Sequence, residues 1–127
     1  MRSHGEVLTF GNGDCGQLGH GIEEDDDIAV KYPRILKPLR DKKVCSVACG
    51  GLHNAVLTEA GHVYTWGCND DGSLGRDGEE WCPLLVADLQ DESIISVSCG
   101  DGQTMGVSSG GKVFGWGCYK VNDSFIF

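Results

Sequence analysis

The chain has 127 residues, of which 19 are acidic and 10 are basic, so its formal net charge at pH 7 is -9. Such a charge disfavours a broad phosphate-binding surface, and therefore nucleic acid as the sole partner. The 40% apolar content favours one folded domain, and the lack of a long apolar run or a signal peptide predicts a soluble, intracellular protein with no membrane partner.

The first part of the chain returns later in the sequence. A shift of 56 positions places Val7–Gly11 over Val63–Gly67, and the same shift places Asp14–Gly19 over Asp70–Gly75. Both copies end in Leu-Gly. This similarity indicates an internal repeat.

A second shift extends the repeat to the rest of the chain. Moving residues 33–68 by 50 positions onto residues 83–118 gives 12 identities in 36 ungapped positions. The two shifts differ because the loop around Glu23–Asp27 varies in length. The repeating unit therefore has about 50 to 56 residues, and the chain holds a little over two units.

Each complete unit contains three short segments rich in Val, Leu, Tyr and Trp. In chain order they are Lys43–Cys49, Asn54–Thr58 and His62–Trp66, and glycines lie in the connections between them. This composition predicts three strands joined by tight turns. The twenty glycines of the chain also disfavour a helix-rich fold.

A weaker fourth segment follows the recurring prolines, at Ile35–Leu36 and at Leu84–Val86. We expect an edge strand that begins at Pro33 or Pro83, because proline cannot donate to the interior of a ladder. The first strand of the unit carries little polar surface on either side. Both of its faces, with Val44, Ser46 and Ala48 on one and Cys45, Val47 and Cys49 on the other, are therefore expected to be covered.

Four short antiparallel strands in a unit of this length are typical of a β-propeller blade. The predicted fold is all-β, an incomplete β-propeller. Residues 1–118 would form the partial propeller, with units at about 1–21, 33–75 and 83–118, and residues 119–127 would form a divergent or truncated tail.

The seven cysteines are an odd number, which disfavours a closed disulfide framework and favours reduced thiols. Cys49 recurs as Cys99 and Cys68 as Cys118, as expected of small packing residues. Only Cys45 and Cys49 lie close in sequence, so we predict no metal site. Redox or metal chemistry is the alternative to packing.

Several motifs have a functional and a structural interpretation. The glycine-rich segment Gly11–Gly16 resembles a phosphate-binding loop, but it recurs in the next unit and no helix follows it, which favours a turn. His53, replaced by Gln103 one unit later, is interpreted as a hydrogen-bonding strut for loop backbone rather than as a general base. Glu23–Asp27 indicates a solvated loop, with a calcium site as the alternative. No catalytic set, cofactor site or small-molecule substrate is predicted.

Two motifs resemble the regulator of chromosome condensation repeat. They are V-x-x-x-G-x-G-D-x-G-Q-L-G-x-G at Val7–Gly21 and G-G-x-H-x-x-x-L-x-x-x-G-x-V-Y-x-W-G at Gly50–Gly67. The resemblance implies seven blades, of which this chain holds a little over two. The structural residues of the repeat would be Gly11, Gly16, Gly19, Gly50, His53, Trp66, Gly67, Gly72, Gly75, Gly100, Trp116 and Gly117.

Residues 67–77 further resemble the founding member of this family, for which the resemblance implies nucleotide exchange on the small GTPase Ran, chromatin binding and a nuclear location. Asp14 and Asp101 match its GTPase-facing surface, with Asp70 and Lys120 as weaker candidates. The alternative role for these aspartates is to bond the backbone of their own turns. Histones or chromatin would be partners of the full-length protein only.

Residues 119–127 depart from the family pattern because they contain no glycine. The family's basic amino-terminal arm and its protruding wedge are also missing from this sequence. We therefore expect a non-enzymatic fragment that is not competent for exchange by itself. The alternative is an interaction module of a scaffold or ubiquitin-ligase-type member, which would be cytoplasmic.

Overall fold

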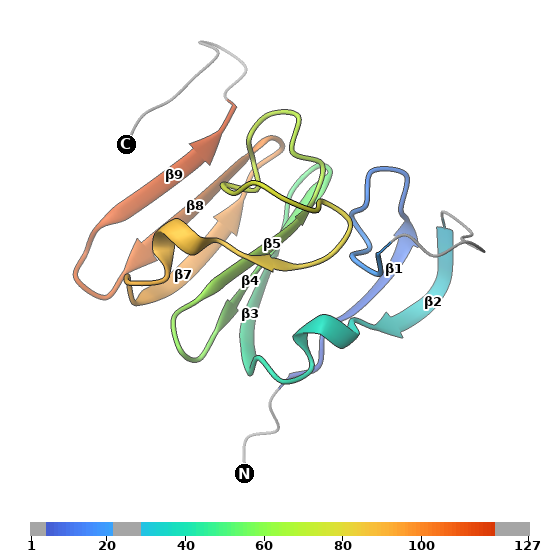
Figure 1. Ribbon diagram of the computed structural model, residues 1–127, viewed down its shortest axis with the longest axis horizontal. Coiled ribbons are helices and arrows are strands. Elements are labelled where there is room, and N and C mark those ends of the chain that lie inside the picture. The colour runs from blue at the N-terminus through green and yellow to red at the C-terminus, as the bar shows by residue number, and fades with distance from the viewer. Residues whose placement is uncertain (1–4, 22–28, 119–127) are drawn as a thin grey trace.

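A computed structural model describes residues 5–21 and 29–118. In these residues it has nine strands, arranged as antiparallel sheets of two, four and three strands, and two short 3-10 helices. The sheets follow one another side by side (Figure 1). The predicted all-β fold is confirmed.

The first sheet pairs β1 (Leu8–Asn12) with β2 (Ala29–Ile35). Pro33 lies inside β2, whereas the sequence predicted that it would begin the strand. The register shifts between Thr9 and Gly11 of the partner strand, and β2 pairs on one side only among the described residues. A proline is tolerated there because an irregular edge strand does not need its N–H for a ladder.

The second sheet is a complete four-stranded unit in the order β3-β4-β5-β6. Its strands are β3 (Val44–Cys49), β4 (His53–Thr58), β5 (Val63–Gly67) and β6 (Leu84–Leu85). The predicted strands are therefore present to within one residue at each end, and the segment after Pro83 is the edge strand. The short β6 suits a sheet margin.

The third sheet repeats the second without an outer strand among the described residues. It contains β7 (Ile94–Cys99), β8 (Gln103–Ser108) and β9 (Val113–Gly117). The register shifts at Val44/Ser46 in β3 and at Ile94/Ser96 in β7, so even the irregularity obeys the 50-residue repeat.

Two 3-10 helices that the sequence did not predict connect the sheets. They are η1 (Lys37–Leu39) and η2 (Ala87–Leu89), and each buries its leucine. A single 3-10 turn leaves too little periodicity to be recognised in a sequence.

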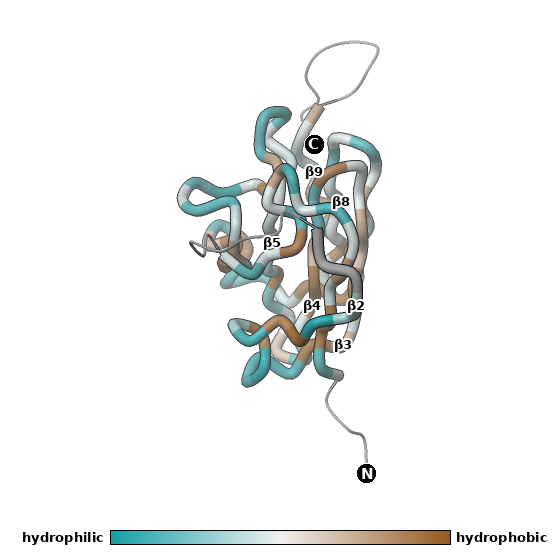
Figure 2. The backbone as a smooth tube through the Cα atoms, turned by 90° about the vertical axis from the view of Figure 1, so that its right-hand side faces the viewer, coloured by the Kyte–Doolittle hydropathy of each residue, from teal (hydrophilic) through white to brown (hydrophobic). Residues whose placement is uncertain are grey.

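The core lies between successive sheets. One cluster joins η1 and the second sheet through Leu36, Leu39, Val44, Val56 and Trp66, with Val7, the residue before β1, packed against it. The other cluster contains Ala55, Leu57, Val63, Val86, Leu89 and Ile94, with Val97, Cys99, Phe114 and Trp116 of the third sheet packed against it. Figure 2 shows the hydrophilic loops that project beyond the strands. Each sheet is thus stabilised by its neighbours.

One expectation about β3 is wrong. Val47 is 60% exposed, and Cys45 and Cys49 are exposed too, so the second face of this strand is uncovered. The equivalent residues Val97 and Cys99 of β7 pack against the second sheet. Val47 lacks such cover because the described part of the first sheet consists only of counterparts of β5 and β6.

The two repeated tryptophans occupy equivalent places. Trp66 lies opposite Asn54 in the register of β4 and β5, and Trp116 lies opposite Thr104 in that of β8 and β9. Trp66 is 2% exposed, whereas Trp116 is only partly buried. The difference arises at the open flank of the third sheet.

No helix of the described residues is long and apolar enough to cross a membrane.

Candidate partner-binding rim

The loops after β1, β3, β5 and β7 lie at the same end of the molecule (Figure 1). Backbone hydrogen bonds tie these loops together. The Gly51 N–H donates to the Asp101 carbonyl at 3.2 Å, and the Cys68 N–H donates to the Leu52 carbonyl at 2.9 Å. These bonds make the loop end a continuous surface across the sheets.

This loop end is strongly acidic. We call it the acidic rim and define it by the exposed Asp14, Asp70, Asp71, Asp77, Glu79 and Asp101 and the partly buried Glu80. Arg76 is the one lysine or arginine in residues 13–21, 50–52, 68–83 and 100–102. A surface of this sign attracts a cationic partner and accelerates its association.

Asp14 is exposed and also bonds its own turn. The Asp14 N–H donates to Asn12 Oδ1 at 2.8 Å, and Asn12 Nδ2 donates to Asp14 Oδ2 at 3.0 Å. These two contacts form a local polar turn. They leave other lone pairs of the carboxylate available, because an ionised carboxylate has about four acceptor sites.

Asp101 lies beside a residue that the sequence argument did not select. A side chain built on Gly102 would have its Cβ 2.8 Å from Asp71 Oδ2, so the Asp71 carboxylate adjoins the loop that carries Asp101. Both carboxylates act electrostatically on His53. The repeat selects Asp70, because Asp70 aligns with Asp14. Asp71 becomes a candidate rim residue only through its contact with the loop of Asp101 in the structure.

His53 lies beneath this surface and connects two sheets. Its Nε2 is 2.8 Å from the Thr104 hydroxyl, which itself donates to the Ser73 carbonyl at 2.7 Å. The Thr104 oxygen therefore accepts a hydrogen bond from His53 Nε2. Burial lowers the pKa of His53, while the Gln103 backbone and the Asp101 and Asp71 carboxylates oppose this shift. His53 thus contacts both the Thr104 side chain and the Gln103 backbone of the next sheet.

Repeated contacts between loops and tryptophans hold the rim in place. Trp66 Nε1 donates to the Gln17 carbonyl at 2.9 Å, and Trp116 Nε1 donates to the Ser73 carbonyl at 2.8 Å. The loop glycines allow this approach. A Cβ on Gly19 would lie 2.8 Å from Trp66, and a Cβ on Gly75 would lie 2.6 Å from Trp116.

The remaining structural glycines recur in the same backbone states. Gly67 and Gly117 end β5 and β9, and Gly11 is the last residue but one of β1, with φ of +111°, +109° and +104° respectively. At Gly67 a side chain would collide with the Leu52 carbonyl, and at Gly50 it would collide with the His53 ring and the Gly100 carbonyl. Glycine is required where backbones approach this closely.

Cys99 is the thiol most strongly affected by its surroundings among those of the described residues. Burial raises the pKa of Cys99 to about 11. A high pKa lowers the thiolate fraction and therefore the nucleophilicity of this thiol. Within residues 5–21 and 29–118, no three His, Cys, Asp or Glu side chains are grouped to hold a metal ion.

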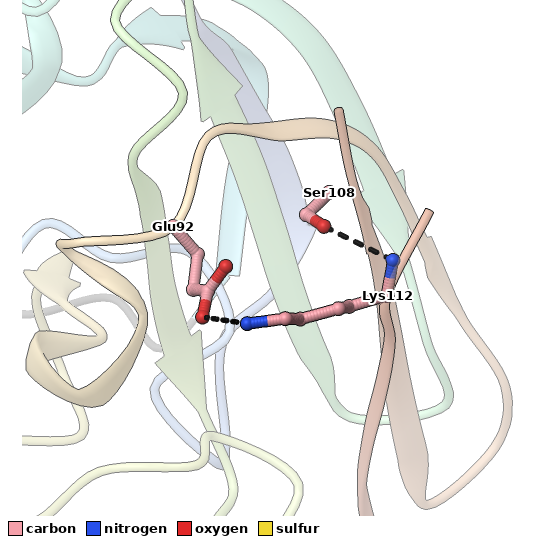
Figure 3. Close-up of polar contacts among 3 residues, drawn as sticks. All are labelled: Glu92, Ser108 and Lys112. Atoms are coloured by element: carbon pink, nitrogen blue, oxygen red, sulfur yellow. Dashed lines mark hydrogen bonds and ion pairs between the residues drawn. The ribbon is translucent and has the colours of Figure 1, made fainter. Parts of the chain in front are cut away.

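The opposite end of the molecule has balanced charge. Its turns and 3-10 helices carry five basic and five acidic residues, namely Lys37, Arg40, Lys42, Lys43, Lys112, Asp41, Glu59, Asp88, Asp91 and Glu92. Lys112 Nζ lies 3.3 Å from Glu92 Oε1, and the Lys112 N–H donates to Ser108 Oγ at 3.1 Å (Figure 3). The charge asymmetry therefore distinguishes the two ends.

Two features that the sequence analysis considered, Lys120 and Glu23–Asp27, lie outside the described residues.

Comparison with known proteins places this architecture in a family. The family described as "Regulator of chromosome condensation (RCC1) repeat" matches residues 4–57 and 60–107. The regulator of chromosome condensation of Xenopus laevis is 45% identical over 76 residues, which are 60% of this chain and 17% of that protein. Human E3 ubiquitin-protein ligase HERC2 is 45% identical over 75 residues, 59% of this chain and 2% of the ligase.

A solved structure agrees in fold. Prp20p from Saccharomyces cerevisiae, reported with its binding properties to Gsp1p and histones, aligns with a TM-score of 0.79 and 30% identity. The alignment covers 92% of this chain and 29% of Prp20p. The chain thus corresponds to less than a third of that propeller protein, and the described fold is an incomplete propeller. This chain belongs to the regulator of chromosome condensation (RCC1) repeat family.

Proposed function

We propose that this chain is a fragment of a guanine nucleotide exchange factor-like propeller, and that its acidic rim binds a basic surface of the small GTPase Ran. The observation that carries the proposal is the exposure of Asp14 and Asp101 at one end of the sheets. Asp70 and Asp71 lie in the loop between them and add to the same negative field. In this role the chain binds and regulates and is not itself an enzyme.

The proposal includes a limit on activity. The acidic rim is formed by loops of three successive sheets and provides part of a binding surface, while the chain spans 29% of Prp20p and 17% of the Xenopus regulator. We therefore expect binding to Ran without catalysed nucleotide release. Contacts with histones or chromatin, and a nuclear location, would belong to the full-length protein. Lys120 would be a further contact to Ran.

A second candidate is an interaction propeller of a ubiquitin-ligase-type scaffold, which would be cytoplasmic. The chain is 45% identical to HERC2 over 75 residues, and this supports the second candidate. The identity to the Xenopus regulator, which supports the first candidate, is also 45%. In that case the rim would bind a basic surface on another protein.

Binding of the full chain to immobilised nucleotide-free Ran tests the first proposal, with Asp14→Asn and Asp101→Asn as variants. We expect each to weaken binding about three- to tenfold, since exposed charges at an interface rim contribute modestly. Asp91→Asn, at the opposite end, is the matched control and should bind like the native chain. If both rim variants bind Ran as tightly as the native chain, or if the native chain does not bind Ran, the exchange-factor proposal is contradicted and the scaffold candidate is left.

A further inference from the structure

The segment that leads into the second sheet is basic, although the chain as a whole is acidic. It consists of residues 37–43, from η1 to the start of β3, and we call it the basic turn. Its cations are all exposed, and they are Lys37, Arg40, Lys42 and Lys43. Asp41 is the one acidic residue in this range, so the basic turn has a formal charge of +3 in a chain of -9.

The repeat provides a copy of the basic turn with the same backbone and the opposite charge. In the basic turn the Lys42 N–H donates to the Leu39 carbonyl at 3.1 Å, and in the copy the Glu92 N–H donates to the Leu89 carbonyl at 3.0 Å. The copy, residues 87–93, carries three carboxylates and neither lysine nor arginine, so its formal charge is -3. The fold of this turn therefore does not require the four cations.

The backbone of Lys43 is a second, independent observation. Among the described residues it is the one residue other than glycine with a positive φ, which is +55°. A left-handed backbone is costly for lysine and less so for glycine or asparagine. The equivalent Ser93 does not adopt it. A costly conformation that the copy of the turn does without is typical of a functional position.

The carboxylates near the basic turn lie towards its Lys43 end. The Glu59 N–H donates to the Lys43 carbonyl at 3.0 Å, and Glu6 follows Gly5, which pairs with Val44. Lys37 and Arg40 belong to η1 and its C-cap, at the other end of the turn. Lys42 Nζ lies 5.8 Å from the centroid of the Tyr64 ring, a contact that positions this cation without neutralising it.

The distribution of charge favours a compact anion over an extended one. Duplex DNA or an anionic membrane would reach beyond one turn and meet Asp88, Asp91 and Glu92 of the copy, which repel it. A phosphate group carries about -1.5 to -2 charges at pH 7, so two or three such groups on one small molecule match four cations. Carboxylates of an acidic peptide carry one charge each and are spread along its backbone.

We propose that the basic turn binds a small molecule that carries several phosphate groups, of the inositol polyphosphate class. Arg40 would donate two N–H groups to one phosphate, as its planar guanidinium allows. Lys37, Lys42 and Lys43 would bind the others as mobile point charges. This binding is independent of the acidic rim, which lies at the opposite end of the sheets.

Isothermal titration calorimetry of the full chain with inositol hexakisphosphate, in a metal-free buffer of low ionic strength, tests the proposal. We expect saturable binding. Inositol monophosphate should bind at least about tenfold more weakly, because the attraction increases with the number of phosphates. Absence of saturable binding, or equal binding of the two compounds, overturns the proposal.

Variants of the basic turn locate the site. The double variant Lys37→Gln/Arg40→Gln should bind inositol hexakisphosphate at least about tenfold more weakly, which corresponds to about 1.4 kcal/mol. Lys112→Gln removes a lysine that is paired with Glu92 in the next unit, and this control should bind like the native chain. Undiminished binding by the double variant, or an equal loss in the control, contradicts the assignment to the basic turn.

Lys43→Asn separates binding from folding. Asparagine removes the charge but adopts a left-handed backbone at lower cost. Binding should therefore weaken at least about threefold while the melting temperature stays the same or rises. Undiminished binding by this variant would contradict the part assigned to Lys43.

Competition distinguishes the free compound from larger sources of phosphate. A short DNA duplex, and phosphatidylcholine vesicles that contain phosphatidylinositol bisphosphate, are each added at the same phosphate concentration as inositol hexakisphosphate. We expect both to compete at least about tenfold more weakly, because each also meets the acidic copy of the turn. Equal competition by either one would contradict a compact soluble ligand.

Discussion

At the scale of single residues, the contacts between glycines and tryptophans carry the repeat. Gly19 meets Trp66 and Gly75 meets Trp116, and in each case the indole N–H also bonds a loop carbonyl. The loop glycine thus has two requirements, a positive φ and the absence of a side chain. These requirements can be separated experimentally, because Gly72 has the first without the second.

We predict that Gly75→Ala destabilises the chain more than Gly72→Ala. The left-handed backbone costs alanine about 1–2 kcal/mol at either position. At Gly75 the new methyl group would also meet Trp116 at 2.6 Å, and such overpacking costs about 1–3 kcal/mol more. Urea denaturation followed by circular dichroism measures the difference. Equal losses would show that Trp116 does not press on this loop.

His53 predicts a pH dependence of stability. Burial holds its pKa in the folded state below the ordinary value, so the unfolded chain binds a proton more readily. Stability should therefore fall as the pH drops below about 6.5, the ordinary histidine pKa, until the folded pKa is reached. His53→Gln retains a donor for Thr104, and its melting temperature should change less between pH 7.5 and 5.5. An identical pH dependence in native chain and variant would contradict a role for His53.

At the scale of elements, hydrogen bonds between sheets supplement the apolar contacts. Asn54 Nδ2 and Trp66 Nε1 both donate to the Gln17 carbonyl, and one unit later Thr104 and Trp116 both donate to the Ser73 carbonyl. Each loop carbonyl is thus bound by two strands of the following sheet. This arrangement sets the position of one sheet relative to the next.

Thr104 has the most contacts in this arrangement, so we predict that Thr104→Val costs about 1–3 kcal/mol of unfolding free energy. Valine preserves the shape but removes the acceptor for His53 and one donor to Ser73, and the side chain is fully buried. Thr104→Ser retains the hydroxyl and should lose less. Thermal denaturation compares the two variants, and a valine variant as stable as the serine variant would contradict the prediction.

At the scale of the whole molecule, both flanks of the stack expose apolar residues that are covered at equivalent interior places. Phe10 is 63% exposed although it corresponds to the buried Trp66, and Val113 is 48% exposed although it corresponds to the buried Val63. Val47 is exposed too, although the equivalent Val97 packs against a neighbouring sheet. Contiguous apolar flanks of this kind promote association.

We predict that the purified chain associates at micromolar concentration, because pairing of flanks from different copies removes these side chains from water. Sedimentation velocity should show species larger than 13.6 kDa. A Val47→Lys/Val113→Lys double variant should shift the distribution towards the monomer. Ser109→Lys, in an exposed turn, adds charge outside the flanks and should not. A native chain that sediments as a monomer would contradict this prediction.

Much of the fold could be predicted from local signals. Strand boundaries, the edge position of β6 and the equivalence of Trp66 and Trp116 followed from alternating apolar residues, prolines and a 50-residue period. These features depend on residue type and spacing along the chain, which a repeated sequence states more than once. Asp14 and Asp101 were selected instead through the family resemblance, and the structure leaves both exposed.

Other features depended on packing between segments distant in sequence. Two of these features are contacts between different sheets, namely the approach of Asp71 to the Asp101 loop and the hydrogen bond from His53 to Thr104. Two others are surfaces that no neighbouring sheet covers, at Val47 and at Gly72. The sequence by itself determined the repeating blade, because strand periodicity and turn glycines act over a few residues. Only the tertiary structure decided which faces are covered and which carboxylates meet, because burial depends on the neighbouring sheet that each unit receives.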